Sequence, residues 1–479
     1  MTDLFKQIDA ILHPRSIAFV GITTSNPFHW TRTFWTATRA FGFKGPLYPV
    51  NPRGGELDGC RVYTSLDEVP GDVDFIIGTV AARTAPEIMK KCAGKGVRGI
   101  HFCTAGFAET EQEDVARLQD ELTRLSRETG IRIIGPNCMG VYCPESRVSF
   151  DSDFSRESGP VGLISQSGAN ANHLIKAANR RGVKFSKVIS YGNACDLNEC
   201  DLLEYLIEDP HTQIIALYLE GVKDGRRFFN LMKKATAEKP VVLLKAGIGD
   251  AGARAAATHT ASLSGSDNIW EALCRQMNII RVVDTEELVD VLATLCFIPD
   301  PGGRNVVLIG PGGGSSVLIT DDFERHGFRL PRVPDSIVAE LATFSETAGN
   351  MLRNPIDYSQ SIEDARKVAR AVDLLTRWDE VDLCVGFFRP SHTPQEVWLF
   401  MLDWGKAIMK AYRASHKPVA YILENVGPPD RYQVNYQLQQ MYVEEKFALY
   451  FSFPGAAGAL KKVIDYNERH ARWTARSSK

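Results

Sequence analysis

The stretch Ser16-Ile-Ala-Phe-Val-Gly21 decides the fold, because it is the first of five short β-rich runs near the start of the chain. Amphipathic stretches such as residues 85–94 and 112–129 separate these runs. Strands that alternate with helices predict a parallel, doubly wound sheet, in which a ligand lies beyond the carboxyl ends of the strands. The other four runs lie at residues 47–52, 73–78, 99–103 and 131–135.

The same alternation continues through the rest of the chain. Residues 162–165 predict a strand, which a tight turn joins to a helix at residues 172–180. After a linker at residues 299–303, another unit begins with a strand at residues 305–310, a glycine-rich loop and a helix at residues 317–326. We therefore predict an α/β fold of three doubly wound units. They are a Rossmann-like domain over residues 1–150 and two flavodoxin-like domains over residues 151–300 and 301–479.

The composition is that of a soluble globular protein. Hydrophobic residues make up 44% of the 479 residues and charged residues 24%. The formal net charge of -3 does not favour nucleic-acid binding, and no apolar stretch is long enough to span a membrane. The N-terminus lacks the pattern of a signal peptide, so we expect a cytoplasmic protein. We expect reduced cysteines and no metal site, because the pairs Cys138/Cys143 and Cys195/Cys200 do not have zinc spacing.

One stretch of small residues surrounds a histidine. Residues 255–267 read AAATHTASLSGSD and place His259 among alanine, serine and threonine. We expect a long loop after a strand at residues 241–245, on which the small neighbours leave the imidazole accessible to a partner. A neutral imidazole is a nucleophile at physiological pH, although most loop histidines are ordinary surface residues. The neighbouring motifs decide between these two interpretations.

Several strand ends are candidates for phosphate binding. Gly21 ends the first strand, but the sequence after it is not G-x-G-x-x-G, so a complete NAD site is poorly supported. Arg53 follows the second strand, where its guanidinium meets either a phosphate or solvent. The helix after Gly168 begins with exposed backbone amides, which either bind phosphate without a lysine or belong to a simple helix cap. The turn with Gly312, Gly313 and Gly314 either cradles a phosphate or lets helix and sheet pack closely.

Five motifs follow one another in the order seen in NDP-forming acyl-CoA synthetases, the relatives of the succinyl-CoA synthetase α subunit and of the ADP-forming acetyl-CoA synthetases. The chain resembles this family closely up to roughly residue 300 and more loosely beyond it. The motifs are Gly135-Pro-Asn-Cys-Met-Gly-Val141, Gly162-Leu-Ile-Ser-Gln-Ser-Gly-Ala169, Ser190-Tyr-Gly-Asn193 with Asp196 and Glu199, Leu217-Tyr-Leu-Glu-Gly-Val-Lys-Asp224, and Thr258-His-Thr-Ala-Ser-Leu-Ser-Gly265.

The resemblance implies a phosphorelay, in which His259 carries a phosphoryl group between an acyl phosphate site and a nucleotide site. Glu220, at the end of a predicted strand, matches the glutamate that orients the histidine. Ser167 and Gly168 match the positions that meet the phosphate. The first domain is then expected to hold CoA. Its matching residues are Gly21 and Arg53 near the phosphates, Thr23 among the other contacts, and Val80, Thr104 and Asn137 at the thiol end or the acyl pocket.

The family resemblance also implies a partner. No segment reads as an ATP-grasp domain, and the P-loop pattern is absent. The chain is therefore expected to be the α subunit of an acid–CoA ligase in a hetero-oligomer. A separate ATP-grasp β subunit would hold most of the ATP or ADP with Mg²⁺. Two alternatives remain open: a phosphohistidine phosphotransferase with a non-CoA acceptor, and a non-enzymatic CoA- or nucleotide-binding regulator.

The sequence departs from the family in two places. Thr258 and Ala261 stand where serine and glycine are usual, and both are small enough to keep the segment intact. The loop after Gly21 is unusual, since it leads into an aromatic run. This run is either the core of a helix, or part of a modified CoA pocket or a pocket for a bulkier acyl substrate. The aromatic residues are Phe28, Trp30, Phe34 and Trp35.

Overall fold

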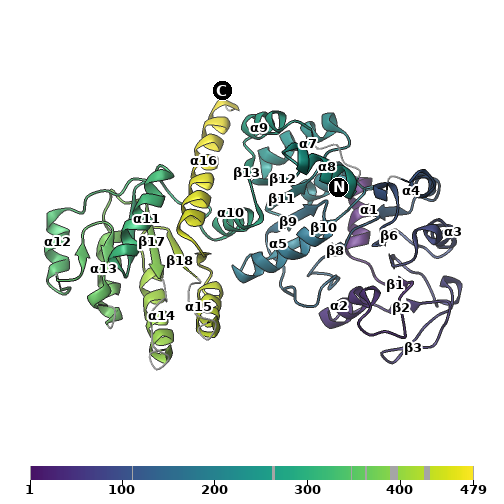
Figure 1. The fold of residues 1–479 in the computed structure, drawn as a ribbon, viewed down its shortest axis with the longest axis horizontal. Coiled ribbons are helices and arrows are strands. Elements are labelled where there is room, and N and C mark those ends of the chain that lie inside the picture. Colours follow the sequence, from purple (N-terminus) through teal and green to yellow (C-terminus); the bar gives the residue numbers. More distant parts are fainter. Residues whose placement is uncertain are drawn as a thin grey trace. The chain divides into compact units, whose positions relative to one another are not determined.

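The computed structural model describes residues 2–110, 112–260, 265–346, 348–361, 364–388, 398–424 and 432–477. For residues 257–260, 361, 398–401, 432, 434 and 474–477 it describes the backbone alone. The chain divides into two compact units (Figure 1). Unit 1 holds Met1–Asn179 and Lys184–Val283, and unit 2 holds Arg180–Val183 and Asp284–Lys479.

The first sheet of unit 1 confirms the predicted parallel, doubly wound arrangement. Its strands, in spatial order, are β2 (Leu47–Val50), β1 (Ile17–Val20), β5 (Phe75–Gly78), β6 (Gly99–Phe102) and β7 (Arg132–Ile134), and all pairs are parallel. The chain runs from β1 to β2 on one side and then to β5 on the other. The topological switch point, where ligands bind in such sheets, therefore lies between β1 and β5.

Helices and one small hairpin complete this first domain. Apolar residues such as Ile76 and Ile100 are fully buried, as expected for parallel strands that helices cover on both faces. The helices are α1 (Asp3–Leu12), α2 (Thr33–Phe41), α3 (Ala85–Cys92) and α4 (Glu113–Thr129), and the hairpin is β3 (Glu56–Leu57) with β4 (Cys60–Arg61).

The second sheet of unit 1 also has the predicted α/β order. Its strands are β13 (Ile280–Val282), β12 (Val241–Lys245), β11 (Ile214–Leu219), β9 (Val161–Ser165), β10 (Phe185–Ser190) and β8 (Gly140–Tyr142). Only β8 runs antiparallel to its neighbour. The chain thus enters the second sheet before residue 150. The helices are α5 (Gly168–Arg180), α6 (Glu199–Glu208), α7 (Gly225–Glu238), α8 (Asp250–Thr260) and α9 (Asp267–Gln276).

Two expectations about local structure in this domain were wrong. The first helix begins at Gly168 and not at residue 172, so the glycine is itself the first helical residue. Residues 250–260 form helix α8, where we expected a loop. Alanine is the strongest helix former, and the alanine-rich sequence DAGARAAATHT has enough of it to extend a helix as far as Thr260. The backbone of His259 therefore lies in the last turn of α8.

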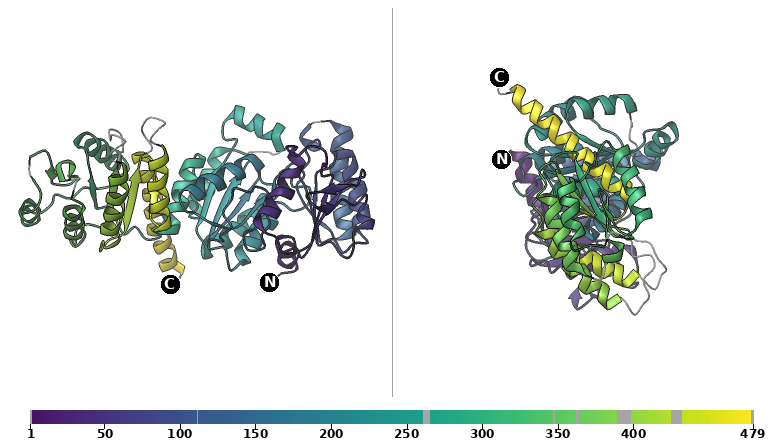
Figure 2. Two further views of the ribbon diagram at one scale, coloured as in Figure 1. Left: turned by 90° about the horizontal axis from the view of Figure 1, so that it is seen from below. Right: turned by 90° about the vertical axis from the view of Figure 1, so that its left-hand side faces the viewer.

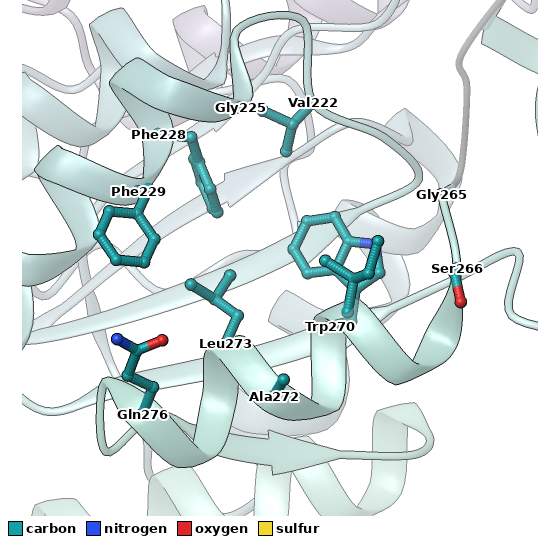
Figure 3. A pocket seen from close by; sticks show the side chains of 11 residues that line it. Val222, Gly225, Phe228, Phe229, Gly265, Ser266, Trp270, Ala272, Leu273 and Gln276 are labelled. Atoms are coloured by element: carbon teal, nitrogen blue, oxygen red, sulfur yellow. The ribbon is translucent and has the colours of Figure 1, made fainter.

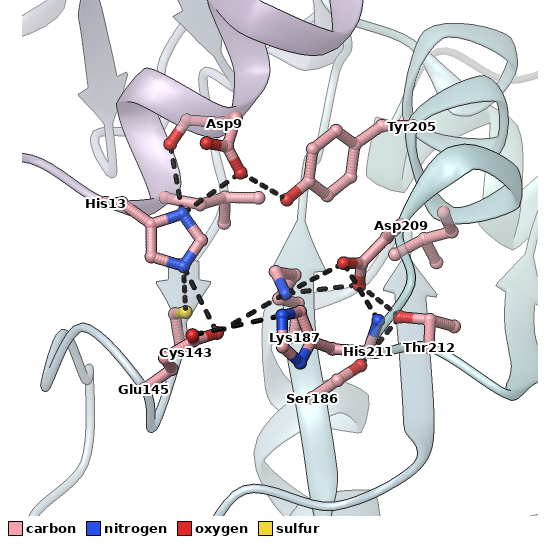
Figure 4. A network of polar contacts seen from close by, with 12 residues as sticks. Asp9, His13, Cys143, Glu145, Ser186, Lys187, Tyr205, Asp209, His211 and Thr212 are labelled. Atoms are coloured by element: carbon pink, nitrogen blue, oxygen red, sulfur yellow. Dashed lines mark hydrogen bonds and ion pairs between the residues drawn. The ribbon is translucent and has the colours of Figure 1, made fainter. Parts of the chain in front are cut away.

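A polar network joins α1 to the second sheet of unit 1 (Figure 4). Asp9 Oδ1 lies 3.1 Å from His13 Nδ1 and accepts a hydrogen bond of 2.9 Å from the Tyr205 hydroxyl. Lys187 Nζ, on buried β10, lies 3.1 Å from Asp209 Oδ2. Charges this deeply buried are tolerated only when they are paired. The network therefore fixes the N-terminal helix on the second domain.

Unit 2 is built on the third sheet. Two groups of helices cover its opposite faces (Figures 1 and 2), with α10, α11 and α16 in contact on one side and α13, α14 and α15 on the other. The strands, in spatial order, are β15 (Met351–Leu352), β16 (Ile356–Asp357), β14 (Val306–Gly310), β17 (Leu383–Phe388), β18 (Val419–Leu423) and β19 (Ala448–Tyr450). The helices are α10 (Thr285–Phe297), α11 (Gly313–Arg325), α12 (Asp335–Ala342), α13 (Ala365–Thr376), α14 (Trp398–Arg413), α15 (Tyr432–Glu444) and α16 (Phe453–Ser477).

No helix within the described residues has the length and apolar character that a membrane span requires. All ten cysteines are free thiols.

Candidate functional site

The switch point of the first sheet brings four of the predicted residues together. Gly21 has φ of 91°, and a Cβ there would lie 2.8 Å from Val80 Cγ1, so only glycine fits. The Thr104 hydroxyl donates a hydrogen bond to the Val80 carbonyl oxygen, and the Asn137 N–H donates one of 3.0 Å to the Thr104 carbonyl oxygen. Gly21, Val80, Thr104 and Asn137 therefore form one chain of contacts along the carboxyl edge of the sheet.

Thr23 and Arg53 lie on two neighbouring loops at the same edge. The Thr23 N–H donates to Thr31 Oγ1 at 3.3 Å, which folds the loop after β1 back on itself. Asn51 Nδ2 donates to the Ile22 carbonyl oxygen at 2.8 Å, and Asn51 Oδ1 accepts from the Arg53 N–H at 2.9 Å. Asn51 thus ties the loop after β2 to the loop after β1. The Arg53 side chain is exposed to solvent beyond this edge.

The aromatic run after Gly21 divides into two pairs. Phe34 and Trp35 belong to the helix core, since their exposed fractions are 2% and 0%. Phe28 and Trp30 are instead 95% and 49% exposed. The interpretation as helix core therefore holds for Phe34 and Trp35, while Phe28 and Trp30 lie on the surface.

Asn137 also connects the first domain to the second. It has φ of 59°, and its Nδ2 lies 3.4 Å from Asn193 Oδ1. Asn193 Nδ2 donates to Glu109 Oε2 at 2.6 Å, and Glu109 belongs to the short helix η4 (Ala108–Thr110). Lys223 Nζ donates to the Asn193 carbonyl oxygen at 2.9 Å. The sequence motif contained Asn193, but nothing in it indicated this bridging contact.

The carboxyl edge of the second sheet holds three more of the predicted residues, Ser167, Gly168 and Glu220. Gly168 begins α5 and Ser167 directly precedes it, so the positive end of the helix dipole lies at this edge. Glu220 follows β11 and is 4% exposed. Gln166 Oε1 accepts the N–H groups of Glu220 and Gly221 at 2.8 and 3.1 Å. Gln166 therefore holds the backbone of Glu220 next to the start of α5.

Lys245 is a buried cation that we did not predict from the sequence. It ends β12, and its Nζ donates to the carbonyl oxygens of Glu220, at 2.8 Å, and of Ala246. Its Nζ also lies 5.4 Å from the centre of the Trp270 ring. Burial lowers the pKa of the Lys245 ammonium from 10.5 to about 8, although the charge of Glu220 acts in the opposite direction. The only signal in the sequence is a lysine at the end of an apolar run.

The helix that carries His259 lies beside the first domain. Helix α8 contacts η4 of the first domain. The η4 residue Glu109 in turn holds Asn193, which lies beside Asn137. The His259 side chain and Ala261 lie outside the described residues, so the predicted contacts of the imidazole are not tested.

Comparisons with known proteins agree with this arrangement. Residues 15–144 match the model of a CoA binding domain, and residues 158–295 match the model of a succinyl-CoA ligase like flavodoxin domain. The acetate–CoA ligase (ADP-forming) II subunit alpha of Pyrococcus furiosus is 36% identical over 381 residues, which are 79% of this chain and 82% of that protein. The chain belongs to the NDP-forming acyl-CoA synthetase family.

Two further members of this family are informative. The acetate–CoA ligase (ADP-forming) of Methanocaldococcus jannaschii is 33% identical over 354 residues, which are 73% of this chain but 49% of that longer protein. The structure of a dinucleotide forming acetyl-coenzyme A synthetase 1 from Ca. Korarchaeum cryptofilum, in complex with phosphate and ADP, has a TM-score of 0.80 and 28% identity. The similarity covers 97% of each chain, so it includes the third domain, where the motif match was loose.

The glycine-rich turn of this acyl-CoA synthetase chain lies in unit 2. Gly312 has φ of 104°, and its N–H donates to Asp357 Oδ1 at 2.9 Å and to Ser359 Oγ at 2.7 Å. A Cβ on Gly313 would lie 3.5 Å from Asp357 Oδ2. A carboxylate therefore already lies at the start of α11.

The second domain also has an apolar cavity of about 350 Å³ between α7 and α9 (Figure 3). Phe228, Trp270 and Leu273 are among the residues that line it. Its polar side chains are Ser266 and Gln276, and no charged side chain of the described residues lines it.

Proposed function

We propose that this chain is the α subunit of an NDP-forming acid–CoA ligase that works through a phosphohistidine on His259. In the direction of synthesis, His259 takes the γ-phosphoryl group of ATP and releases ADP. A carboxylate oxygen of the acid then attacks the phosphorus, which breaks the N–P bond and gives an acyl phosphate. The CoA thiolate attacks the carbonyl carbon, and inorganic phosphate leaves as the acyl-CoA forms. Separate transfers replace one difficult reaction of three substrates.

The contact of α8 with η4 is the observation that carries this proposal. It brings the helix of His259 beside the bridge from Glu109 through Asn193 to Asn137. The same residue, Asn137, ends the chain of contacts that begins at Gly21. These linked contacts support the proposal that His259 carries the phosphoryl group to the thiol end of the CoA site.

The proposed roles in the second domain follow from charge and burial. Glu220 accepts a hydrogen bond from one imidazole nitrogen of His259 and leaves the other free to take phosphate. The amides at Ser167 and Gly168 receive the phosphoryl oxygens, because the start of α5 carries the positive end of the helix dipole. For the turn at Gly312 to Gly314 we propose a weaker phosphate contact, since Asp357 already accepts from Gly312.

The first domain, over residues 1–150, is proposed to hold CoA along the carboxyl edge of its sheet. Gly21, Thr23 and Arg53 lie beyond β1 and β2, at the end for the phosphates. Val80, Thr104 and Asn137 lie beyond β5, β6 and β7, at the end for the thiol and the acyl group. The domain over residues 151–300 carries the relay, and residues 301–479 form the third domain.

We also propose a separate ATP-grasp β subunit, which holds the nucleotide with Mg²⁺ in a cytoplasmic hetero-oligomer. The name of the Pyrococcus relative, subunit alpha, supports this proposal. The longer Methanocaldococcus protein fits an arrangement in which the two parts are one chain.

The experiment is phosphate incorporation from labelled ATP into the chain, mixed with its ATP-grasp partner, for the wild type and His259→Ala. We expect acid-labile label in the wild type only, and discharge of that label by acid plus CoA. Discharge by acid plus another acceptor would favour the phosphotransferase alternative. Absence of label, or label that persists in His259→Ala, would refute the relay and favour a regulator.

A further inference from the structure

The loop after β1 presents two exposed aromatic rings at the ligand edge of the CoA-binding domain. Phe28 is 95% exposed and Trp30 is 49% exposed. Large aromatic side chains gain free energy when they leave water, so a pair exposed beside a binding site marks a surface that a ligand covers. No part of the proposed reaction uses these rings.

The segment that carries the rings is held at several points. The Phe28 N–H donates to Asn26 Oδ1 at 3.0 Å, and the Thr23 N–H donates to Thr31 Oγ1 at 3.3 Å. Arg32 Nη2 and Trp35 Nε1 donate to the two oxygens of Asp58, at 2.6 and 2.8 Å. The rings therefore project from a fixed segment, and binding to them requires little ordering of the chain.

The position of the segment along the sheet edge indicates which part of a ligand it meets. Asp58 and Asn51, which hold the segment, both follow β2. Arg53, on the same loop as Asn51, is exposed at this end of the edge. The thiol end of the proposed CoA site lies in the opposite direction, beyond β6 and β7, where Thr104 and Asn137 lie.

We propose that Phe28 and Trp30 form a stacking platform for the adenine base of CoA, beside a phosphate contact at Arg53. The ring pair and the cation match the two features of an adenosine bisphosphate, a flat base and phosphate charge. This inference rests on the proposed function, because it takes CoA as the ligand of the first domain. It assigns a ligand contact to residues at which this sequence departs from its family.

The test is calorimetric titration of the full-length chain with CoA, adenosine 3′,5′-bisphosphate and pantetheine, for the wild type and the double variant F28A/W30A. The rings are exposed, so the variant is expected to keep the wild-type Tm. Affinity for CoA and for the bisphosphate should fall about tenfold, which corresponds to ~1.4 kcal/mol. Affinity for pantetheine, which has no base, should not change.

Two control variants sharpen the result. Trp30→Phe keeps a ring and should keep most of the affinity. Tyr436→Ala removes a 55% exposed ring in unit 2 and should change none of the three affinities.

Three outcomes would overturn the platform while leaving the proposed function intact. They are unchanged CoA affinity in the double variant, an equal loss for pantetheine, or a raised KM for an aromatic acid at unchanged CoA affinity. A double variant that binds CoA normally but no longer associates with the β subunit would instead make this surface a subunit interface. A wild-type chain that binds neither CoA nor the bisphosphate would overturn the proposed function together with the platform.

Discussion

The turn that begins α5 in unit 1 and the turn that begins α11 in unit 2 have the same architecture and different electrostatics. Both follow a buried parallel strand and lead through small residues into a helix of 13 residues. At α11, the Asp357 carboxylate accepts from the Gly312 amide. At α5, the contacts of Ser167 within the described residues include the Ser165 hydroxyl, which donates to its carbonyl oxygen, and the Asn170 N–H, which donates to its hydroxyl, and neither contact involves a carboxylate. A glycine-rich turn therefore predicts a helix start, but its neighbours decide whether it attracts an anion.

The largest expected effect concerns Glu220. If the proposed relay operates, replacing Glu220 with glutamine should lower the kcat of acyl-CoA synthesis about 10²-fold, because the imidazole would lose the charge that we propose fixes its tautomer and supports phosphoryl transfer. The KM for CoA should stay unchanged, since the proposed CoA site lies in the other domain. Steady-state kinetics of the assembled enzyme measure both values. A raised KM at normal kcat would mean that Glu220 serves substrate binding instead.

The variants Gly168→Ala and Gly314→Ala test whether a methyl group fits at the start of α5 and at the start of α11. A Cβ on Gly168 would lie 2.6 Å from Met139 Cγ, so Gly168→Ala should destabilise unit 1 by about 1–3 kcal/mol. Gly314 has nothing within 4 Å of such a Cβ, so Gly314→Ala in α11 should be neutral or stabilise unit 2 by up to ~1 kcal/mol. Denaturant titration followed for each unit checks the difference. Equal losses of stability in the two variants would contradict the predicted difference in space between the two turns.

Asp357→Asn tests the carboxylate at the α11 turn. The asparagine keeps one oxygen acceptor but loses the charge, so unit 2 should lose about 1–2 kcal/mol. Binding of inorganic phosphate to the chain should become tighter, because the repulsion at Gly312 is removed. Calorimetry with phosphate, with Asp364→Asn at the N-cap of α13 as control, measures this change. Weaker phosphate binding would show that Asp357 holds the turn in its binding geometry.

The smallest effect concerns Lys245 and pH. Its folded pKa of about 8 lies below the ordinary 10.5, so between these values the unfolded chain binds a proton that the folded chain has released. Stability then rises with pH across this window for this group. Lys245→Met removes this group's contribution to the pH dependence of stability. The wild-type free energy of unfolding minus that of the variant should therefore increase from pH 8 to 10.5, and a constant difference would contradict the lowered pKa.

All five strands of the first sheet were predicted, because short apolar runs such as residues 73–78 are buried on both faces. Strands β10, β13 and β19 of the other two sheets were missed, since β10 contains Ser186 and Lys187 and the other two have only three residues each. The place of Glu220 at the end of a strand was predicted from the apolar run before it, while its orienting role came from the family resemblance and stays a prediction.

Helix α8 was missed because glycine and threonine near its alanines favoured a loop. The contact of Asp357 with Gly312 joins residues 45 positions apart, and Lys245 becomes special only through burial. Local sequence patterns do not contain such long-range contacts.

The most direct test of the contrast between the two turns is the rate at which His259 takes up labelled phosphate from ATP in the assembled enzyme. Wild type, Glu220→Gln and Asp357→Asn are compared by rapid quenching. We predict a loss of about 10²-fold for Glu220→Gln and a change of less than about threefold for Asp357→Asn. A loss for Asp357→Asn as large as that for Glu220→Gln would contradict this prediction, because the α11 turn would then contribute to the phosphoryl site as much as the edge that holds α5.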